Sequence, residues 1–117
     1  MDPARARELL ERERERIEHA IARLRSDDAQ PDDAEPHTDQ HLADQASDLY
    51  DRELDEGLLG DLRDQLAAVE RAERRLAEGT YGRSIESGEP IPDARLEAVP
   101  TAERTVAEQQ RYERGRR

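Results

Sequence analysis

The chain has 117 residues, of which 42% are charged and 33% hydrophobic, and its formal net charge is −11 at pH 7. This composition excludes a thick globular core and favours long, thin helices that each bury one apolar stripe, with disorder as the alternative. The acidic balance disfavours direct DNA binding, in which Lys and Arg side chains neutralise phosphates. The absence of cysteine excludes disulfides and thiolate metal ligands.

Signals for a membrane protein or an enzyme are missing from the sequence. No apolar run approaches the roughly eighteen residues that a membrane-spanning helix needs, and the opening segment MDPARARELLERERER lacks the apolar centre of a secretory signal. We therefore expect a cytoplasmic protein without membrane contact. No Ser-His-Asp, P-loop, Rossmann or zinc-protease motif occurs, so no independent catalytic activity is expected.

The first predicted helix begins at Asp2 and Pro3. An Asp side chain caps the free N–H groups of a helix start, and a proline in the first turn has no N–H to leave unpaired. Apolar residues then recur at spacings of seven, four and three, which places them on one helix face and favours a helix over disorder. These residues are Leu10, Ile17, Ile21 and Leu24.

A loop and a second, longer helix follow. Residues 26–40 contain two prolines, five aspartates and no large apolar residue, which predicts a turn or loop. The second helix is expected from about Thr38 or the next residue to Glu78. Gly57 and Gly60 each cost up to about 1 kcal/mol relative to Ala inside a helix, which makes them the expected place of a bend. The apolar stripe of this helix comprises Leu42, Ala46, Leu49, Leu59, Leu62, Leu66, Val69 and Leu76.

Folding the two helices back on each other would bury both stripes. Because the second helix is longer, we expect its last turns, from Leu66 to Leu76, to lack a partner in the first helix and to be covered by the C-terminal segment. A third helix is predicted from about Thr101 to Arg114. The apolar residues that this segment can contribute are Tyr81, Ile85, Ile91, Leu96, Val99 and Val106.

Residues 79–108 have the spacing of a four-cysteine zinc module, C-x2-C-x17-C-x2-C, with every cysteine replaced. The four positions are occupied by Ser84, Ser87, Thr105 and Glu108. Neutral hydroxyl groups are poor zinc ligands, so no metal cofactor is predicted, and a site for a hard cation is the weaker alternative. We expect hydrogen bonds or water to satisfy these former ligand positions.

A second motif lies in the run DQHLADQASDLYDRE, residues 39–53. It follows the pattern D-x-H-P-A-D-x-A, with Leu42 where proline is usual. The matching residues are Asp39, His41, Ala43, Asp44 and Ala46. Two such motifs in this order, with a long amphipathic helix between them, closely resemble the DksA/TraR family of bacterial transcription regulators, in particular its Gram-positive branch.

The helix pattern and the resemblance together predict an all-α fold. Residues 1–78 are expected to form an antiparallel two-helix coiled-coil hairpin with a tip loop at about 26–41. Residues 79–117 are expected to form a small zinc-finger-like module, which is metal-free and packs with a C-terminal helix at the base of the hairpin. Relatives would hold zinc in this module.

The resemblance also implies a transcription regulator that binds RNA polymerase through its secondary channel and modulates initiation. The acidic tip of the hairpin would contact the polymerase through Asp39, His41, Asp44, Ala46 and Asp48. Asp44 is expected to make the main contact, and Ala46 to permit close approach. Without the resemblance, Asp44 would be interpreted as a helix-start carboxylate near the positive end of the helix dipole, and Ala46 as a hairpin-core residue.

Two other functions stay open at this point. A secondary-channel factor that lends acidic residues to hold a second magnesium ion would promote transcript cleavage by the polymerase. A stress-response coiled-coil protein with another partner would not bind core polymerase. We expect a monomer that does not bind DNA directly.

Overall fold

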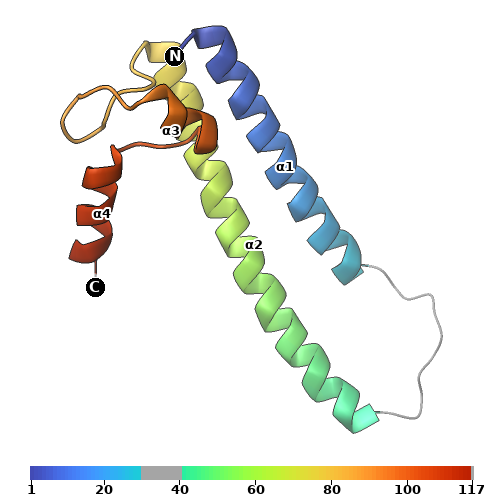
Figure 1. Cartoon of the computed structure of the whole chain (residues 1–117). Coiled ribbons are helices and arrows are strands. Elements are labelled where there is room, and N and C mark those ends of the chain that lie inside the picture. Colours follow the sequence, from blue (N-terminus) through green and yellow to red (C-terminus); the bar gives the residue numbers. More distant parts are fainter. Residues whose placement is uncertain (30–40, 117) are drawn as a thin grey trace. The chain divides into compact units, whose positions relative to one another are not determined.

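The computed structural model describes residues 1–29 and 41–116, and the side chains of residues 1–26 and 48–116. The described elements are the helices α1 (Pro3–Ala29), α2 (His41–Glu78), α3 (Asp93–Ala98) and α4 (Val106–Gly115) (Figure 1). They group into two compact units, one made of Met1–Glu15 and Ala67–Arg117 and the other of Arg16–Leu66. None of the helices in these described ranges is long and apolar enough to span a membrane.

The start of α1 confirms the predicted cap. The Asp2 carboxylate accepts a hydrogen bond from the Arg5 N–H at 3.2 Å, and the Asp2 carbonyl accepts one from the Ala6 N–H at 3.0 Å. Pro3 occupies the first helical position, where a missing N–H leaves no unpaired donor. The helix therefore begins where the sequence predicts.

In the first unit, the beginning of α1 packs against the end of α2. The buried side chains here are Ala6, Leu9 and Leu10 of α1 with Val69 and Ala72 of α2. At the edge of this contact, the Arg14 guanidinium donates to Glu73 at 2.6 Å. The expectation that the last turns of α2 lack a partner in α1 is wrong, because Ala6 and Leu9 extend the apolar face of α1 toward its N-terminus.

In the second unit, the remaining parts of α1 and α2 also run antiparallel. Ile17 is fully buried, and a hydrogen bond of 2.8 Å joins the Arg16 guanidinium to the Gln65 side chain. The half-buried apolar side chains of this unit are Ala20, Ile21 and Leu24 of α1 and Leu59, Leu62 and Leu66 of α2. Leu49, predicted in the buried stripe, is 58% exposed. The side chains of Leu42 and Ala46 lie outside the described residues.

A glycine ends α2 and leads into the C-terminal part of the first unit. Gly79 has a φ of +82°, a left-handed conformation that favours glycine, and the Thr80 N–H returns to the Arg75 carbonyl at 2.9 Å. The core that follows consists of Ile91, Leu96 and Ala102, with Met1 and Tyr81 packed against it. The Tyr81 hydroxyl donates to the Pro100 carbonyl at 2.8 Å, which ties the two ends of this segment together.

The third helix predicted from about Thr101 to Arg114 is present as α4, but it begins later, at Val106, with Thr105 as its N-cap. The short helix α3, which precedes the predicted range, was not expected. The inward positions predicted for Ile85, Val99 and Val106 are wrong, since these side chains are 50%, 39% and 51% exposed. Ile85 lies in a turn, and Val99 and Val106 lie at helix ends.

The predicted all-α fold class is confirmed for the described ranges, with an antiparallel helix pair and short C-terminal helices. The compact units divide both long helices, after Glu15 in α1 and after Leu66 in α2. The division of the chain into residues 1–78 and 79–117 stays a prediction about domains.

Candidate functional site

Ser84 and Ser87 lie in a tight turn between α2 and α3. The turn is closed by the Ser84 N–H, which donates to the Glu89 carbonyl at 2.8 Å, and by the Gly88 N–H, which donates to the Ser84 carbonyl at 3.0 Å. The Ser84 hydroxyl oxygen accepts the N–H groups of Glu86 and Ser87 at 3.0 and 3.2 Å. The Ser87 hydroxyl oxygen accepts the Glu89 N–H at 3.2 Å. Both hydroxyl oxygens are thereby used as acceptors.

Thr105 and Glu108 form a capping box at the start of α4. The Thr105 hydroxyl oxygen accepts the Glu108 N–H at 3.2 Å, and the Glu108 carboxylate accepts the Thr105 N–H at 2.9 Å. These bonds satisfy two donors that would otherwise be free at a helix start. The sequence Thr-Val-Ala-Glu fits this pattern, so the start of α4 could have been predicted from it.

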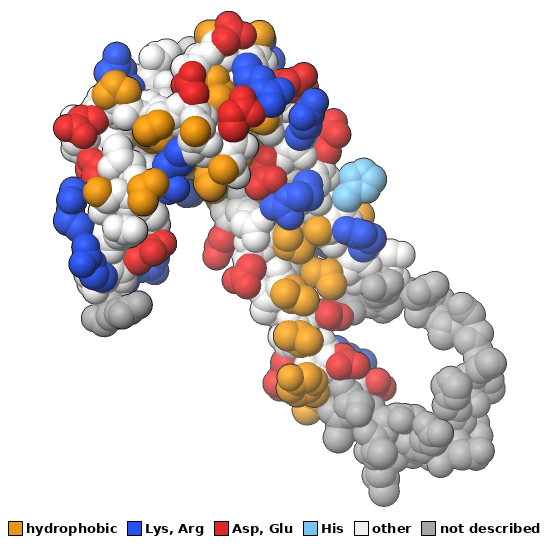
Figure 2. All heavy atoms as spheres, in the orientation of Figure 1, with side chains coloured by type: hydrophobic (Ala, Val, Ile, Leu, Met, Phe, Trp, Pro, Cys, Tyr) orange, Lys and Arg blue, Asp and Glu red, His pale blue; other side chains and the backbone are white. Residues whose placement is uncertain are grey.

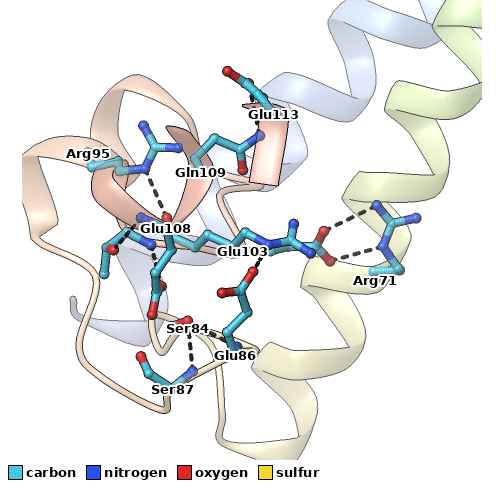
Figure 3. Close-up of polar contacts among 11 residues, drawn as sticks. Arg71, Ser84, Glu86, Ser87, Arg95, Glu103, Glu108, Gln109 and Glu113 are labelled. Carbon is cyan, nitrogen blue, oxygen red and sulfur yellow. Dashed lines mark hydrogen bonds and ion pairs between the residues drawn. The ribbon is translucent and has the colours of Figure 1, made fainter. Parts of the chain in front are cut away.

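The Glu108 side chain brings the four former ligand positions together. It points toward Ser84 and Ser87 (Figure 3), and Glu108 is only 5% exposed. Hydrogen bonds from the Ser84 and Ser87 hydroxyl groups and from the Thr105 N–H lower the pKa of Glu108 from 4.5 to about 2, against the opposing effect of burial. The carboxylate is therefore ionised and well bonded at neutral pH. We call Ser84, Ser87, Thr105 and Glu108 the hydroxyl–carboxylate cluster.

The donor set of this cluster does not fit structural zinc. A C4 site surrounds the ion with four thiolates, whereas this cluster offers three neutral hydroxyl groups and one carboxylate that already accepts hydrogen bonds. In the ranges that the structure describes, no group of three or more His, Cys, Asp or Glu side chains could hold a metal ion.

Glu103 forms a second anchor beside the hydroxyl–carboxylate cluster, between two arginines of α2. Its carboxylate lies 3.0 Å from the Arg71 Nε, a contact shown in Figure 3, and 2.9 Å from the Arg75 Nη1. Burial raises the pKa of Glu103, but the hydrogen bonds and charges of the two arginines outweigh it and leave the pKa below its ordinary value. The Glu103 carbonyl also accepts the Ile85 N–H at 2.9 Å, so this residue joins α2 to the turn.

Sequence reasoning missed the Glu103 anchor. Its visible signal is the pair Arg71 and Arg75, which stand four residues apart on one helix face. The carboxylate partner lies twenty-eight residues further along, and no local pattern marks it. Among the described residues, the buried Nε and Nη2 atoms of Arg75 have no hydrogen-bond partner.

Arg104 links the turn to α4. Its Nε donates to the Glu86 carboxylate at 2.5 Å, and its guanidinium lies 3.8 Å from the centre of the Tyr112 ring. The Arg104 carbonyl accepts the Arg95 Nε–H at 3.1 Å, which adds a contact with α3. Hydrogen bonds and a cation–π contact near the hydroxyl–carboxylate cluster thus connect the turn, α3 and α4.

Most of the predicted tip residues fall outside what the structure describes. Asp39 lies outside the described residues altogether. His41, Asp44 and Ala46 belong to the first turns of α2, but their side chains are not described. Asp48 is exposed. Further along α2, Figure 2 shows hydrophobic groups on the surface, and the exposed apolar side chains there are Leu49, Tyr50, Leu54 and Leu58.

These features define a class of protein in which an antiparallel helix pair carries a C4-type zinc-finger module whose ligand positions hold no thiolate. The profile described as the prokaryotic dksA/traR C4-type zinc finger matches residues 79–114. The structure of transcription factor DksA2 from Pseudomonas aeruginosa is 32% identical, with a TM-score of 0.75 over 98% of this chain and 86% of that one. The chain belongs to the DksA/TraR family.

Two curated relatives extend the comparison. The RNA polymerase-binding transcription factor DksA of Caulobacter vibrioides is 44% identical over 85 residues, which cover 73% of this chain and 58% of that protein. General stress protein 16O of Bacillus subtilis is 41% identical over 71 residues, which cover 61% of this chain and 44% of that protein. The matched region therefore spans little more than half of the first relative's length.

Proposed function

We propose that this protein binds RNA polymerase and regulates transcription initiation. The observation that carries the proposal is the structural match to a transcription factor over 98% of the chain. The sequence match to a polymerase-binding factor of the same family over 73% of the chain supports it further. Binding and positioning suffice for this function, so no covalent chemistry is assigned to the chain.

The charge of the hairpin supports an electrostatic mode of binding. Between residues 48 and 64, α2 carries seven Asp and Glu residues against two Arg residues. A thin acidic helix pair is attracted to a channel that contains metal cations or basic side chains, and this attraction raises the rate of encounter. We propose that the first turns of α2 enter the secondary channel and that Asp39, His41, Asp44, Ala46 and Asp48 form the contact.

Photo-crosslinking from position 44, the expected main contact, tests whether the first turns of α2 bind the polymerase. A photoreactive amino acid at position 44 is expected to crosslink to RNA polymerase, whereas the same group at the exposed position Glu113 of α4 is not. Equal crosslinking from both positions, or none from position 44, would overturn the assignment of the tip.

A matched pair of variants tests the charge of Asp44. Asp44→Asn is expected to weaken polymerase binding about tenfold, and Glu78→Gln, which removes an exposed charge at the other end of α2, to change it little. Circular dichroism of both variants checks that α2 remains helical. If Asp44→Asn lowers the helix content as well, the helix-start role of Asp44 explains the loss.

A transcript-cleavage assay on stalled elongation complexes separates regulation from cleavage. We expect no stimulation of cleavage by this protein. Stimulation that disappears in Asp44→Asn would instead assign the chain to the cleavage factors that hold a second magnesium ion.

We also propose that the C-terminal module functions without zinc. The proposal is supported by the donor set at Ser84, Ser87, Thr105 and Glu108, which suits hydrogen bonding better than zinc binding. Elemental analysis of the purified chain is expected to find far less than one zinc ion per molecule. Stoichiometric zinc would contradict the proposal.

A further inference from the structure

The Ser84 hydroxyl oxygen accepts two hydrogen bonds, and its hydrogen is still free to be donated to another acceptor. A serine hydroxyl has two acceptor lone pairs and one donor hydrogen. The N–H groups of Glu86 and Ser87 occupy the oxygen as donors. The remaining hydrogen can be donated to the Glu108 carboxylate, which points toward Ser84 (Figure 3).

Ser87 and Thr105 also use their hydroxyl oxygens as acceptors and keep a hydrogen to donate. The Ser87 oxygen accepts the Glu89 N–H, and the Thr105 oxygen accepts the Glu108 N–H. Each of these hydroxyl groups keeps one hydrogen to donate, and the Glu108 carboxylate, which is almost fully buried and can only accept, needs such donors. The Thr105 N–H already donates to it at 2.9 Å. The three hydroxyl groups and this N–H can thus supply four donors to a carboxylate that has about four acceptor sites, which agrees with the lowered pKa of Glu108.

We infer that the Glu108 carboxylate replaces the metal ion as the centre of this module, with the polarity of the site inverted. In a C4 site, four negative ligands surround one cation. Here, three hydroxyl groups and one N–H surround one anion. The carboxylate comes from a former ligand position, and it joins the turn at residues 84–88 to the start of α4.

A simple helix cap does not account for this arrangement. A capping box needs only the two bonds between Thr105 and Glu108. It does not require the hydroxyl groups of Ser84 and Ser87, which lie some twenty residues earlier in the chain, nor a Glu that is 95% buried. The inference concerns the closure of the module and holds whether or not the chain binds polymerase.

Thermal unfolding of the full chain tests the inference with a matched pair of variants. Glu108→Gln keeps the size of the side chain but offers one acceptor oxygen and an NH₂ donor to a site that supplies only donors. It is expected to lower the Tm by about 5 °C or more, and Glu89→Gln, an exposed carboxylate in the same loop, to lower it by less than about 1 °C. The Tm of the unmodified chain is expected to be the same with zinc and with EDTA. Equal effects of the two variants, or a Tm that rises with zinc, would overturn the inference.

A second measurement needs no variant and applies even if Glu108→Gln does not fold. The carboxyl carbon of Glu108 is followed by NMR while the pH of the unmodified chain is lowered. Glu108 is expected to keep its ionised signal to well below the ordinary glutamate pKa of 4.5, and the Ser84 and Ser87 hydroxyl protons to exchange slowly enough to be observed. Titration of Glu108 at the ordinary pKa would show that the carboxylate is not the centre of the site.

Discussion

Because of Glu108, the stability of the protein is expected to decrease as the pH falls. Its pKa falls from 4.5 to about 2 on folding, so the stability that the ionised form contributes is fully present above about pH 5 and is lost as the pH falls toward 2. We expect the free energy of unfolding to fall more steeply over this range in the unmodified chain than in Glu108→Gln. Urea denaturation at stepped pH values measures both slopes, and parallel curves would contradict the assignment.

Loss of the Glu103 carboxylate is expected to destabilise the chain, because it leaves a largely buried positive charge without its partner. The Arg75 side chain is 13% exposed, and the Glu103 carboxylate is its ion-pair partner at 2.9 Å. Glu103→Gln should therefore destabilise the chain by about 2–3 kcal/mol, because it leaves a largely buried guanidinium without a counter-charge. The exposed pair of Arg5 and Glu97 is the control, and Glu97→Gln should cost clearly less because solvent screens this pair. Urea denaturation of both variants makes the comparison, and equal losses would show that burial does not decide the effect.

At the scale of elements, replacing glycine by alanine should raise stability in the long helix α2 and lower it in the turn. Gly57 and Gly60 lie inside α2, and a Cβ added to either would meet nothing within 4 Å. Gly57→Ala and Gly60→Ala should each stabilise the chain by up to about 1 kcal/mol. Gly82 has a φ of +86°, so Gly82→Ala should destabilise it by about 1–2 kcal/mol. Denaturation curves of the three variants test the contrast, which would fail if all three changed stability in the same direction.

The long helices could be predicted from the sequence because their signals are local and repeated. Asp2 and Pro3 mark the start of α1, and Gly79 marks the end of α2. The helix α3 has six residues, fewer than two turns, and is too short to show a period. Leu49 continues the apolar pattern of α2 but is exposed, since periodicity identifies a helix face and not the partner that covers it.

The candidate site could be predicted in position and only partly in chemistry. The cysteine spacing located Ser84, Ser87, Thr105 and Glu108 in advance. It did not show that the Glu108 carboxylate would lie close to the hydrogen-bond donors of the other three residues, because that depends on how the turn and α4 pack in space. The Glu103 anchor also depends on contacts between distant segments.

At the scale of the whole molecule, the net charge of −11 should make polymerase binding depend on salt. Attraction between the acidic helix pair and a cationic site weakens as ions screen it. We expect the Kd for RNA polymerase to rise roughly tenfold between low and physiological ionic strength. A variant with Asp48→Asn, Asp51→Asn and Glu56→Gln should show a shallower dependence. Affinity that does not change with salt would mean that charge does not drive the encounter.

Thr105 and Glu108 take part both in the start of α4 and in the cluster that closes the module. The helix cannot unwind from its first turn without withdrawing the carboxylate from Ser84 and Ser87. Backbone amides at the start of α4 and in the turn should therefore open in one event and exchange with deuterium at a common rate, while the last turn frays by itself. A helix of only ten residues is thereby a cooperative part of the module.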